Sequence, residues 1–229
     1  MKKILVLTGA GISEESGIKT FRDAGGLWEG HDVMEVASPQ GWNKNKELVL
    51  EFYNQRRKQL QTVEPNDAHK FLVKLEKKYK VVIVTQNVDN LHERAGSKNI
   101  IHLHGELLKV RSSLDESLIY ERKEDIHIGD KCEKGSQLRP HIVWFGEAVP
   151  MMAAALKEVI DTDIFIVIGT SLQVYPAANM INYAPPQKQK FIIDRKVPDV
   201  SGIKNMEIYE MKASEGVKLV AEKLLKEVE

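Results

Sequence analysis

The sequence contains little cysteine, no excess of charge of either sign and no long apolar run. Its only cysteine is Cys132, so no disulfide can form within the chain, and this fits a reducing compartment. Lys plus Arg and Asp plus Glu each number 33, which argues against a general nucleic-acid binder but leaves a local basic patch open. No run approaches the roughly 18 apolar residues that a membrane span needs. We therefore expect a cytoplasmic protein that engages neither nucleic acid nor membrane.

The first residues and the length set further limits. Met1-Lys2-Lys3 precede apolar residues as in a signal peptide, but the run is too short and leads directly into a glycine turn. A chain of 229 residues suits one domain with an insertion, or two small domains.

Short β-branched runs alternate with helical or turn-rich sequence. The runs at residues 4–7, 81–84, 164–168 and 191–193 are typical of buried parallel strands. Helices are expected over residues 68–78, 151–159 and 216–228. This alternation predicts an α/β fold with a doubly wound, Rossmann-like parallel sheet, in which ligands bind at the carboxyl ends of the strands.

Two segments break the alternation and predict a smaller inserted lobe. Residues 30–62 include a charged helix at 45–60, and residues 107–138 are polar without clear periodicity. We expect these two insertions to form the smaller lobe of a single catalytic domain. The larger lobe would then comprise residues 1–29, 63–106 and 139–229.

The stretch TGAGISEESGIKTFRD, residues 8–23, follows the first predicted strand and indicates an anion site. Gly9 and Gly11 let the backbone turn sharply and approach a ligand, and Ser13 is suited to cap a helix that begins there. Unpaired N–H groups at such a helix start attract anions, and a dinucleotide pyrophosphate is the usual occupant. Glu14 replaces the third glycine of the G-x-G-x-x-G pattern.

The end of this stretch is its most unusual part. Phe21, Arg22 and Asp23 place an apolar ring, a cation and a carboxylate in a loop that would face the ligand. An ordinary dinucleotide turn does not need them. The alternative is a generic α/β turn with a solvated Arg–Asp pair.

Polar side chains also follow the later strands. Gln86, Asn87 and Asp89 come after the second strand and suit ribose hydroxyls and a carboxamide, although Asn87 or Asp89 could instead, or also, cap a helix. Gly169-Thr170-Ser171 follow the third strand and suit phosphate or ribose. Asp194 ends the fourth strand, where it suits the adenosine ribose or forms a surface ion pair with Arg195.

The segment Ile100-Ile101-His102-Leu103-His104-Gly105 supplies a candidate base. In an extended segment His102 and His104 share a face, and a histidine beside the nucleotide crevice can act as general base near neutral pH. Two histidines also leave a metal site open, but no third ligand stands at an obvious spacing.

The motifs together resemble one family. TGAGIS, SGI, FR, TQNVDNLHERAG, HLHG, LRPHIVWFGE and GTSLQVYPAA are similar, in this order over residues 8–178, to the signature blocks of the sirtuins, the NAD-dependent protein lysine deacylases. The resemblance implies that NAD and an acylated protein lysine meet in a tunnel between two lobes. The products would be nicotinamide, the free lysine and O-acyl-ADP-ribose.

The resemblance also implies residue roles. His104 would be the base that activates a ribose hydroxyl. The residues that would hold NAD, consumed as co-substrate, are Gly9, Ala10, Gly11, Ile12, Phe21, Arg22, Asp23, Gln86, Asn87, Val88, Asp89, Gly169, Thr170, Ser171, Asp194 and Ala213. The substrate peptide would pair as an added strand with Val143, Trp144, Phe145, Gly146 and Glu147.

One face of the helix at 45–60 carries a cation. Its stripe consists of Val49, Phe52, Tyr53, Arg56 and Leu60. A guanidinium in an apolar stripe needs an anion, and a neighbouring carboxylate could equally supply it. Alternatively, the side-chain stem extends to water and carries the guanidinium out of the stripe. FYNQRR is similar to the Tyr-x-x-Arg pair of class III sirtuins. This implies that Tyr53 and Arg56 hold the carboxylate of succinyl- or malonyl-lysine, with Ala24 leaving room for the chain.

The chain departs from the family pattern in two places. Many sirtuins bind a structural zinc through two Cys-x-x-Cys pairs, which here align with Ser112 and Asp115 and with positions near Lys131 and Lys134. We expect the zinc to be lost, with a mixed site of His127, Cys132 and His141 as the alternative. Asp194 stands where many relatives have asparagine.

Two other functions use the same nucleotide site. One is mono-ADP-ribosyl transfer to protein, and the other is a sensor of NAD or ADP-ribose without catalysis. A sensor would need neither His104 nor the Tyr53–Arg56 pair.

Overall fold

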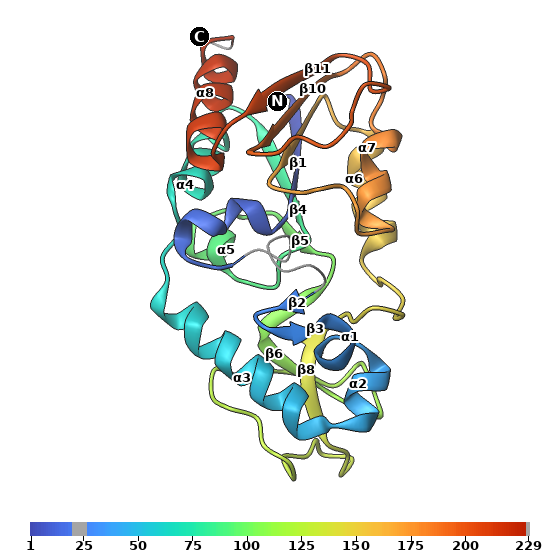
Figure 1. Ribbon diagram of the computed structural model, residues 1–229. Helices are drawn as coiled ribbons and strands as arrows, with labels where there is room; N and C mark the ends of the chain where they lie inside the picture. Colours follow the sequence, from blue (N-terminus) through green and yellow to red (C-terminus); the bar gives the residue numbers. More distant parts are fainter. Residues whose placement is uncertain (20–26, 228–229) are drawn as a thin grey trace.

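The computed structural model describes residues 1–19 and 27–227 and centres on a six-stranded parallel sheet (Figure 1). The strand order is β11-β10-β9-β1-β4-β5. The strands are β1 (Lys3–Thr8), β4 (Lys80–Thr85), β5 (Ile100–His102), β9 (Ile164–Ile168), β10 (Gln189–Asp194) and β11 (Met206–Glu210). The four predicted strands are confirmed as β1, β4, β9 and β10. The edge strands β5 and β11 were not predicted, because β5 is short and β11 is only partly buried.

Helices cover both faces of the sheet, which confirms the doubly wound arrangement. The pair α4 (Asp67–Leu75) and α8 (Ala213–Lys226) packs on one face. The pair α6 (Met152–Ile160) and α7 (Met180–Tyr183) packs on the other (Figure 1). These helices confirm the predictions for residues 68–78, 151–159 and 216–228.

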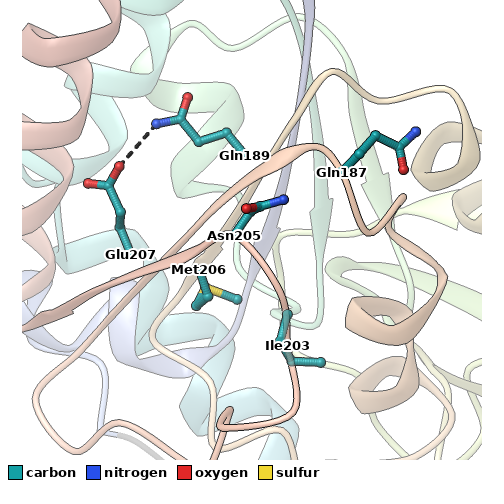
Figure 2. Close-up of a pocket in the computed structure, with 6 residues that line it drawn as sticks. All are labelled: Gln187, Gln189, Ile203, Asn205, Met206 and Glu207. Atoms are coloured by element: carbon teal, nitrogen blue, oxygen red, sulfur yellow. Dashed lines mark hydrogen bonds between the residues drawn. The ribbon is translucent and has the colours of Figure 1, made fainter.

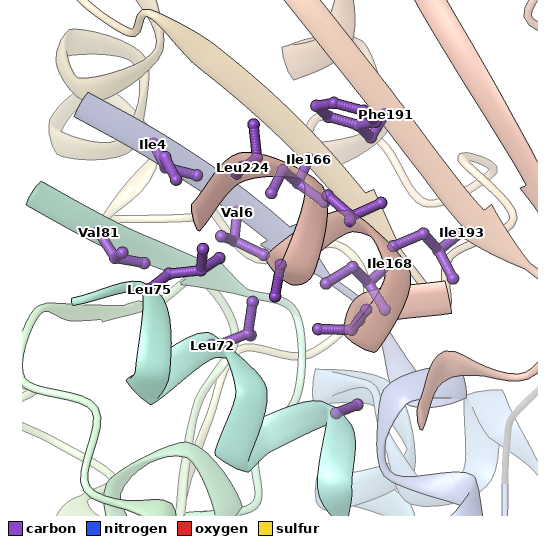
Figure 3. Close-up of a cluster of buried hydrophobic side chains, with 14 of the residues drawn as sticks. Ile4, Val6, Leu72, Leu75, Val81, Ile166, Ile168, Phe191, Ile193 and Leu224 are labelled. Carbon is purple, nitrogen blue, oxygen red and sulfur yellow. The ribbon is translucent and has the colours of Figure 1, made fainter. Parts of the chain in front are cut away.

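The alternation of side chains along each strand divides the core into two layers. In β1, Ile4 and Val6 face α4 and α8, while Leu5 and Leu7 face the opposite helices. Figure 3 shows the first layer, in which Leu72 of α4 and Leu224 of α8 lie over the strands. Each of these fully buried side chains stabilises the fold by roughly 1.5–3 kcal/mol.

A second, antiparallel sheet contains β6 (Gly105–Ser112), β7 (Ile119–Glu121) and β8 (Leu138–Ile142), in the order β7-β6-β8. The remaining elements are the two-stranded β2 (Leu27–Trp28) and β3 (His31–Asp32), and the helices α1 (Val33–Val36), α2 (Pro39–Lys44), α3 (Lys46–Thr62) and α5 (Leu91–Ala95). Helices α1 to α3 share a core with this second sheet. The strand β8 belongs to this sheet as well, although the prediction assigned residues 139–229 to the larger lobe. The predicted division into two lobes stays a prediction.

The helix α3 confirms the one predicted at 45–60, and its buried side chains match the predicted apolar stripe. The fully buried cation, however, is Arg57 rather than Arg56. The Arg57 guanidinium donates to the Leu107 carbonyl at 3.2 Å and to Asn54 Oδ1 at 2.8 Å. Asn54 in turn exchanges two hydrogen bonds with the Ile126 backbone. Arg57 therefore fastens α3 to β6, which the stripe did not reveal.

Within residues 1–19 and 27–227, no helix is long and apolar enough to cross a membrane.

Candidate active site

The carboxyl ends of β1, β4 and β9 are joined by backbone hydrogen bonds. Gly11 N–H donates to the Gly169 carbonyl at 2.9 Å, and Gln86 N–H donates to the Thr8 carbonyl at 2.9 Å. A Cβ added at Gly11 would lie 2.6 Å from Gly169 Cα, so the two turns touch only because glycine stands at both. The sheet extends from β1 through β4 in one direction and through β9 in the other. This is the topological switch point, where open α/β sheets bind ligands.

Ser13, Asn87 and Asp89 form a buried polar cluster at this edge. The Ser13 hydroxyl donates to Asp89 Oδ2 at 2.9 Å and accepts from Asn87 Nδ2 at 3.1 Å. The prediction that Ser13 caps a helix is wrong: the segment forms two 3-10 turns, Ala10–Ile12 and Glu14–Ser16, and the Ser13 hydroxyl makes no cap bond because Asp89 and Asn87 use it.

Asp89 accepts hydrogen bonds through both of its carboxylate oxygens. Its Oδ1 accepts from the N–H of Leu91, the first residue of α5, although the N-cap position itself is occupied by Asn90. Burial raises the pKa of Asp89, while the hydrogen bonds from Leu91 and Ser13 oppose this shift. A buried carboxylate held by donors at a nucleotide crevice is suited to orient a further polar ligand.

The loop after β4 is tied to the loop after β9. Gln86 Nε2 donates to Thr170 Oγ1 at 3.1 Å, and the same hydroxyl accepts from the Leu172 N–H at 3.3 Å. Gly169 has φ +62°, which lets this turn approach Gly11. The predicted residues Gly9–Ile12, 86–89 and 169–171 thus come from three adjacent strand ends. Ala10, Val88 and Ser171 are part-buried there.

His104 lies at the same edge, just beyond β5. Its Nδ1 faces the Gln86 carbonyl at 3.0 Å. A carbonyl accepts only, so Nδ1 carries the proton and Nε2 keeps the lone pair of a base. Burial lowers the pKa of His104, and the hydrogen bond to Gln86 partly opposes this. The imidazole is therefore neutral at pH 7 and able to accept a proton.

Asp194 and Ala213 belong to β10 and α8, on the β9 side of the switch point. Asp194 ends β10, is buried, and accepts from the Lys196 N–H at 2.9 Å. Ala213 begins α8, whose next residue, Ser214, donates its N–H and hydroxyl to Glu15. Arg195 forms an ion pair with Glu14. Phe21, Arg22, Asp23 and Ala24 lie outside the described residues.

The predicted acyl-binding pair lies on α3, where Tyr53 contacts Trp144 after β8 and Arg56 lies over the Phe52 ring. Tyr53 is fully buried, and its hydroxyl accepts from Trp144 Nε1 at 3.0 Å. Because a phenol has one proton to donate, the Tyr53 O–H remains available for an acceptor. Burial raises the pKa of Tyr53, so the phenol keeps that proton at neutral pH.

Arg56 has two buried guanidinium nitrogens that no carboxylate of residues 1–19 and 27–227 pairs with. Its guanidinium lies over the Phe52 ring at 4.9 Å, yet Nε and Nη1 are buried and have no hydrogen-bond partner among the described residues. Burial lowers the pKa of Arg56, opposed by the charge of Glu29. Two buried donors without acceptors are costly, so this site favours an anionic ligand.

Residues 143–147 form a turn after β8 instead of an extended strand. The N–H groups of Val143, Phe145 and Glu147 donate to the carbonyls of His104, Ala37 and Trp144. A peptide backbone would therefore have to pair mainly with the carbonyls of this turn and with Gly146. The pairing itself stays a prediction.

The Glu147 carboxylate holds this turn together. It accepts from Arg139 Nη1 at 2.7 Å, from Arg111 Nη2 at 3.2 Å and from the Trp144 N–H at 2.8 Å. Burial raises the pKa of Glu147, but these hydrogen bonds lower it overall. The side chain thus acts within the protein, which sequence reasoning missed because the two arginines come from other strands.

The positions aligned with the zinc-binding cysteines do meet in space. Ser112 Oγ lies 2.7 Å from Ser136 Oγ, both contact the Cys132 thiol, and Lys134 pairs with Asp115 at 2.6 Å. Hydroxyls, an ion pair and one thiol do not fit a metal that prefers four thiolate or imidazole ligands. Residues 1–19 and 27–227 contain no cluster of three or more potential metal-ligating side chains, and the alternative site of His127, Cys132 and His141 is not formed. The loss of zinc stays a prediction.

A separate hollow of about 500 Å³ opens at the other end of the sheet. Figure 2 shows it beside the amino ends of β10 and β11, where Gln189 donates to Glu207 at 3.1 Å. Its lining consists of Gln187, Gln189, Ile203, Asn205, Met206 and Glu207. The carboxylate of Glu207 is already held by Gln189 and Lys223, and the hollow lies away from the switch point, so it is not the predicted nucleotide site.

The fold and the switch-point residues are typical of one class, the α/β proteins that bind a dinucleotide at the carboxyl ends of their strands. The Sir2 family model matches residues 9–176. An NAD-dependent protein deacylase of Helicobacter pylori is 61% identical over 196 residues, 86% of each chain. One of Bacteroides thetaiotaomicron is 51% identical over 231 aligned positions, with 98% of this chain and 99% of that protein covered. The chain belongs to the Sir2 family.

Solved structures agree with this assignment. A Sir2 homologue in complex with NAD superposes with a TM-score of 0.90 and 37% identity, covering 100% of this chain and 91% of that one. A Sir2 protein bound to an acetylated peptide gives a TM-score of 0.80 at 29% identity, with 96% and 92% covered.

Proposed function

We propose that the protein is an NAD-dependent protein-lysine deacylase that prefers acyl groups ending in a carboxylate. The Sir2 relatives that are 50–61% identical are described as NAD-dependent protein deacylases. The observation that carries the acyl preference is Arg56, whose buried Nε and Nη1 lack acceptors among the described residues.

The switch-point residues suit the binding of NAD. The turns at Gly9–Gly11 and Gly169 permit close approach of the backbone, and the Ser13–Asn87–Asp89 cluster offers amide and carboxylate groups for a ribose and a carboxamide. NAD supplies an electrophilic ribose carbon when its nicotinamide leaves. Asn87 and Asp89 are buried, so their amide and carboxylate groups would meet NAD in a site with little water.

His104 is the proposed general base. Its Nδ1–H is held by the Gln86 carbonyl, so Nε2 accepts a proton from a ribose hydroxyl. The lowered pKa keeps the imidazole neutral between roughly pH 6.5 and 8, where a general base must be free of its proton. The proton leaves as the hydroxyl oxygen forms its new bond to the acyl carbon.

Tyr53 and Arg56 would recognise the distal carboxylate of succinyl- or malonyl-lysine. Tyr53 has an O–H to donate and Arg56 has two N–H donors, and residues at i and i+3 lie on one helix face. A charge-assisted hydrogen bond of this kind contributes roughly 1.5–3 kcal/mol. The preference over acetyl-lysine would then be about ten- to hundred-fold.

The acyl preference is tested by Arg56→Met. Desuccinylation and deacetylation of one peptide sequence are measured as kcat/KM in the wild type and the variant. We expect kcat/KM for the succinyl peptide to fall about ten-fold or more, with little change for the acetyl peptide. The matched control is Lys58→Met, which removes an exposed cation from the same helix. Equal losses on both peptides would contradict carboxylate recognition.

A further inference from the structure

The imidazole of His102 lies between two acceptors. Its Nδ1 is 3.1 Å from the Asn87 carbonyl oxygen and its Nε2 is 2.7 Å from Glu93 Oε1. A neutral imidazole has one N–H, so it can satisfy only one of these contacts, whereas an imidazolium satisfies both. The geometry therefore requires His102 to be protonated. The side chain of His102 is 9% exposed and that of Glu93 39%.

The Asn87 carbonyl belongs to a loop whose backbone is clamped at three consecutive residues. The Gln86 carbonyl accepts from His104, the Asn87 carbonyl from His102 and the Val88 carbonyl from the Leu107 N–H at 2.8 Å. The positions of these three backbone carbonyls determine where the Asn87 and Asp89 side chains lie. The middle clamp is the only one of the three that depends on a net charge.

We propose that His102, held as an imidazolium by Glu93, is a positioning residue that fixes the loop at residues 86–89 in its NAD-binding geometry. This rests on the proposed function, in which Asn87 and Asp89 contact NAD. Deprotonation breaks one of the two hydrogen bonds, and because the carboxylate of Glu93 competes for the remaining proton, the Asn87 carbonyl is released.

The surroundings of His102 set the direction of its titration. Burial alone would lower its pKa, but the Glu93 carboxylate raises it overall, with further help from the Asn87 carbonyl and the charge of Glu106. The charge of Lys109, which pairs with Glu106, helps to lower the pKa of Glu93. The other titratable neighbours are Asp89 and the buried His92, whose pKa lies well below the usual value.

A pH window follows from the two histidines of this segment. The pKa of His104 is lowered, so the base is lost as pH falls below about 6.5. The pKa of His102 is raised, so the loop clamp is present at lower pH and is lost as pH rises through that pKa. Two histidines two residues apart therefore bound the activity from opposite sides.

The test measures NAD binding by calorimetry from pH 6 to pH 10, together with the His102 titration by NMR. The wild type should bind NAD about ten-fold more weakly on the alkaline side, with the midpoint at the His102 pKa. In Glu93→Gln that pKa and midpoint should move together to lower pH. Glu106→Gln removes a nearby charge that does not touch the imidazole, and it should move them much less.

His102→Gln provides a second arm. Both N–H donors of glutamine stand on one nitrogen, so they do not reproduce the two separate ring donors of an imidazolium, and the amide does not titrate. NAD affinity in this variant should be independent of pH and equal to that of the alkaline wild type. An NMR pKa for His102 at or below 6.5, or the same pH dependence in His102→Gln as in the wild type, would overturn the proposal. Binding is measured without an acyl peptide, so a failure of deacylation would be seen separately.

Discussion

At the scale of single residues, the protonation states of the side chains in the site are determined by burial and by hydrogen-bond partners. His104 is neutral because burial lowers its pKa, and its proton lies on Nδ1 because a carbonyl faces that atom. Tyr53 keeps its phenolic proton because burial raises its pKa. Arg56 and Arg57 are neighbours with different partners. Arg57 donates to a carbonyl through Nε and to an amide oxygen through Nη1 and leaves Nη2 unpaired, whereas both Nε and Nη1 of Arg56 lack an acceptor within residues 1–19 and 27–227.

His104→Ala should retain NAD binding and lose turnover, because the substitution removes the base and leaves the glycine turns intact. General-base catalysis contributes about 10²- to 10⁴-fold, so kcat should fall by that factor. The wild-type kcat should fall as pH falls through the His104 pKa, which lies below 6.5. Both are measured by nicotinamide release at saturating NAD. A variant that keeps turnover would assign the base to another residue.

At the scale of elements, the site depends on close contact between the turns after β1 and β9. A methyl group at Gly11 would lie 2.6 Å from Gly169 Cα, and backbone atoms cannot move aside as a side-chain terminus can. The positive φ of Gly169 adds to this requirement. The two turns therefore fix the distance between the parts of the nucleotide site.

Gly11→Ala should destabilise the protein and abolish measurable NAD binding. Overpacking of this kind costs about 1–3 kcal/mol, which urea denaturation detects as a lower midpoint. Gly202→Ala is the matched control, because its Cβ would meet nothing within 4 Å. Equal effects of the two substitutions would contradict the close-approach argument.

The sequence predicted those helices and strands whose own residues show an apolar run or a helical periodicity. The four buried strands are apolar runs, and α3, α4, α6 and α8 show helical periodicity, so each was confirmed. The strands β6 to β8 were not predicted. The residues of β6 and β8 mix buried and part-buried positions without regular alternation, and β7 is three residues long and has no buried position. Family motifs supplied His104 and Asn87. The His102–Glu93 contact joins β5 to α5, and the Arg139–Glu147 contact holds the turn after β8, so tertiary structure alone reveals them.

At the scale of the whole molecule, buried histidines make stability depend on pH. His69 and His92 are fully or nearly fully buried and their rings lie 4.9 Å apart. Burial lowers the pKa of His69 to about 4 and that of His92 well below its usual value. Since the unfolded chain binds these protons at about pH 6.5, stability is present above that pH and is lost as pH falls toward the folded pKa values.

His69→Leu should reduce this sensitivity to acid. Neither ring nitrogen of His69 has a hydrogen-bond partner among the described residues, so the substitution removes buried polar atoms without leaving an acceptor unpaired. Thermal unfolding at pH 7.5 and pH 5 should show a smaller drop in Tm for the variant than for the wild type. An identical drop would show that His69 does not titrate in this range.

The central claim is that NAD cleavage is coupled to removal of the acyl group from lysine. The most direct measurement is mass spectrometry of all products after incubation with NAD and a succinyl-lysine peptide. We predict equal amounts of nicotinamide, free peptide and O-succinyl-ADP-ribose, with no deacylation when NAD is omitted. Nicotinamide release with ADP-ribose attached to protein, or with the peptide still succinylated, would contradict the account.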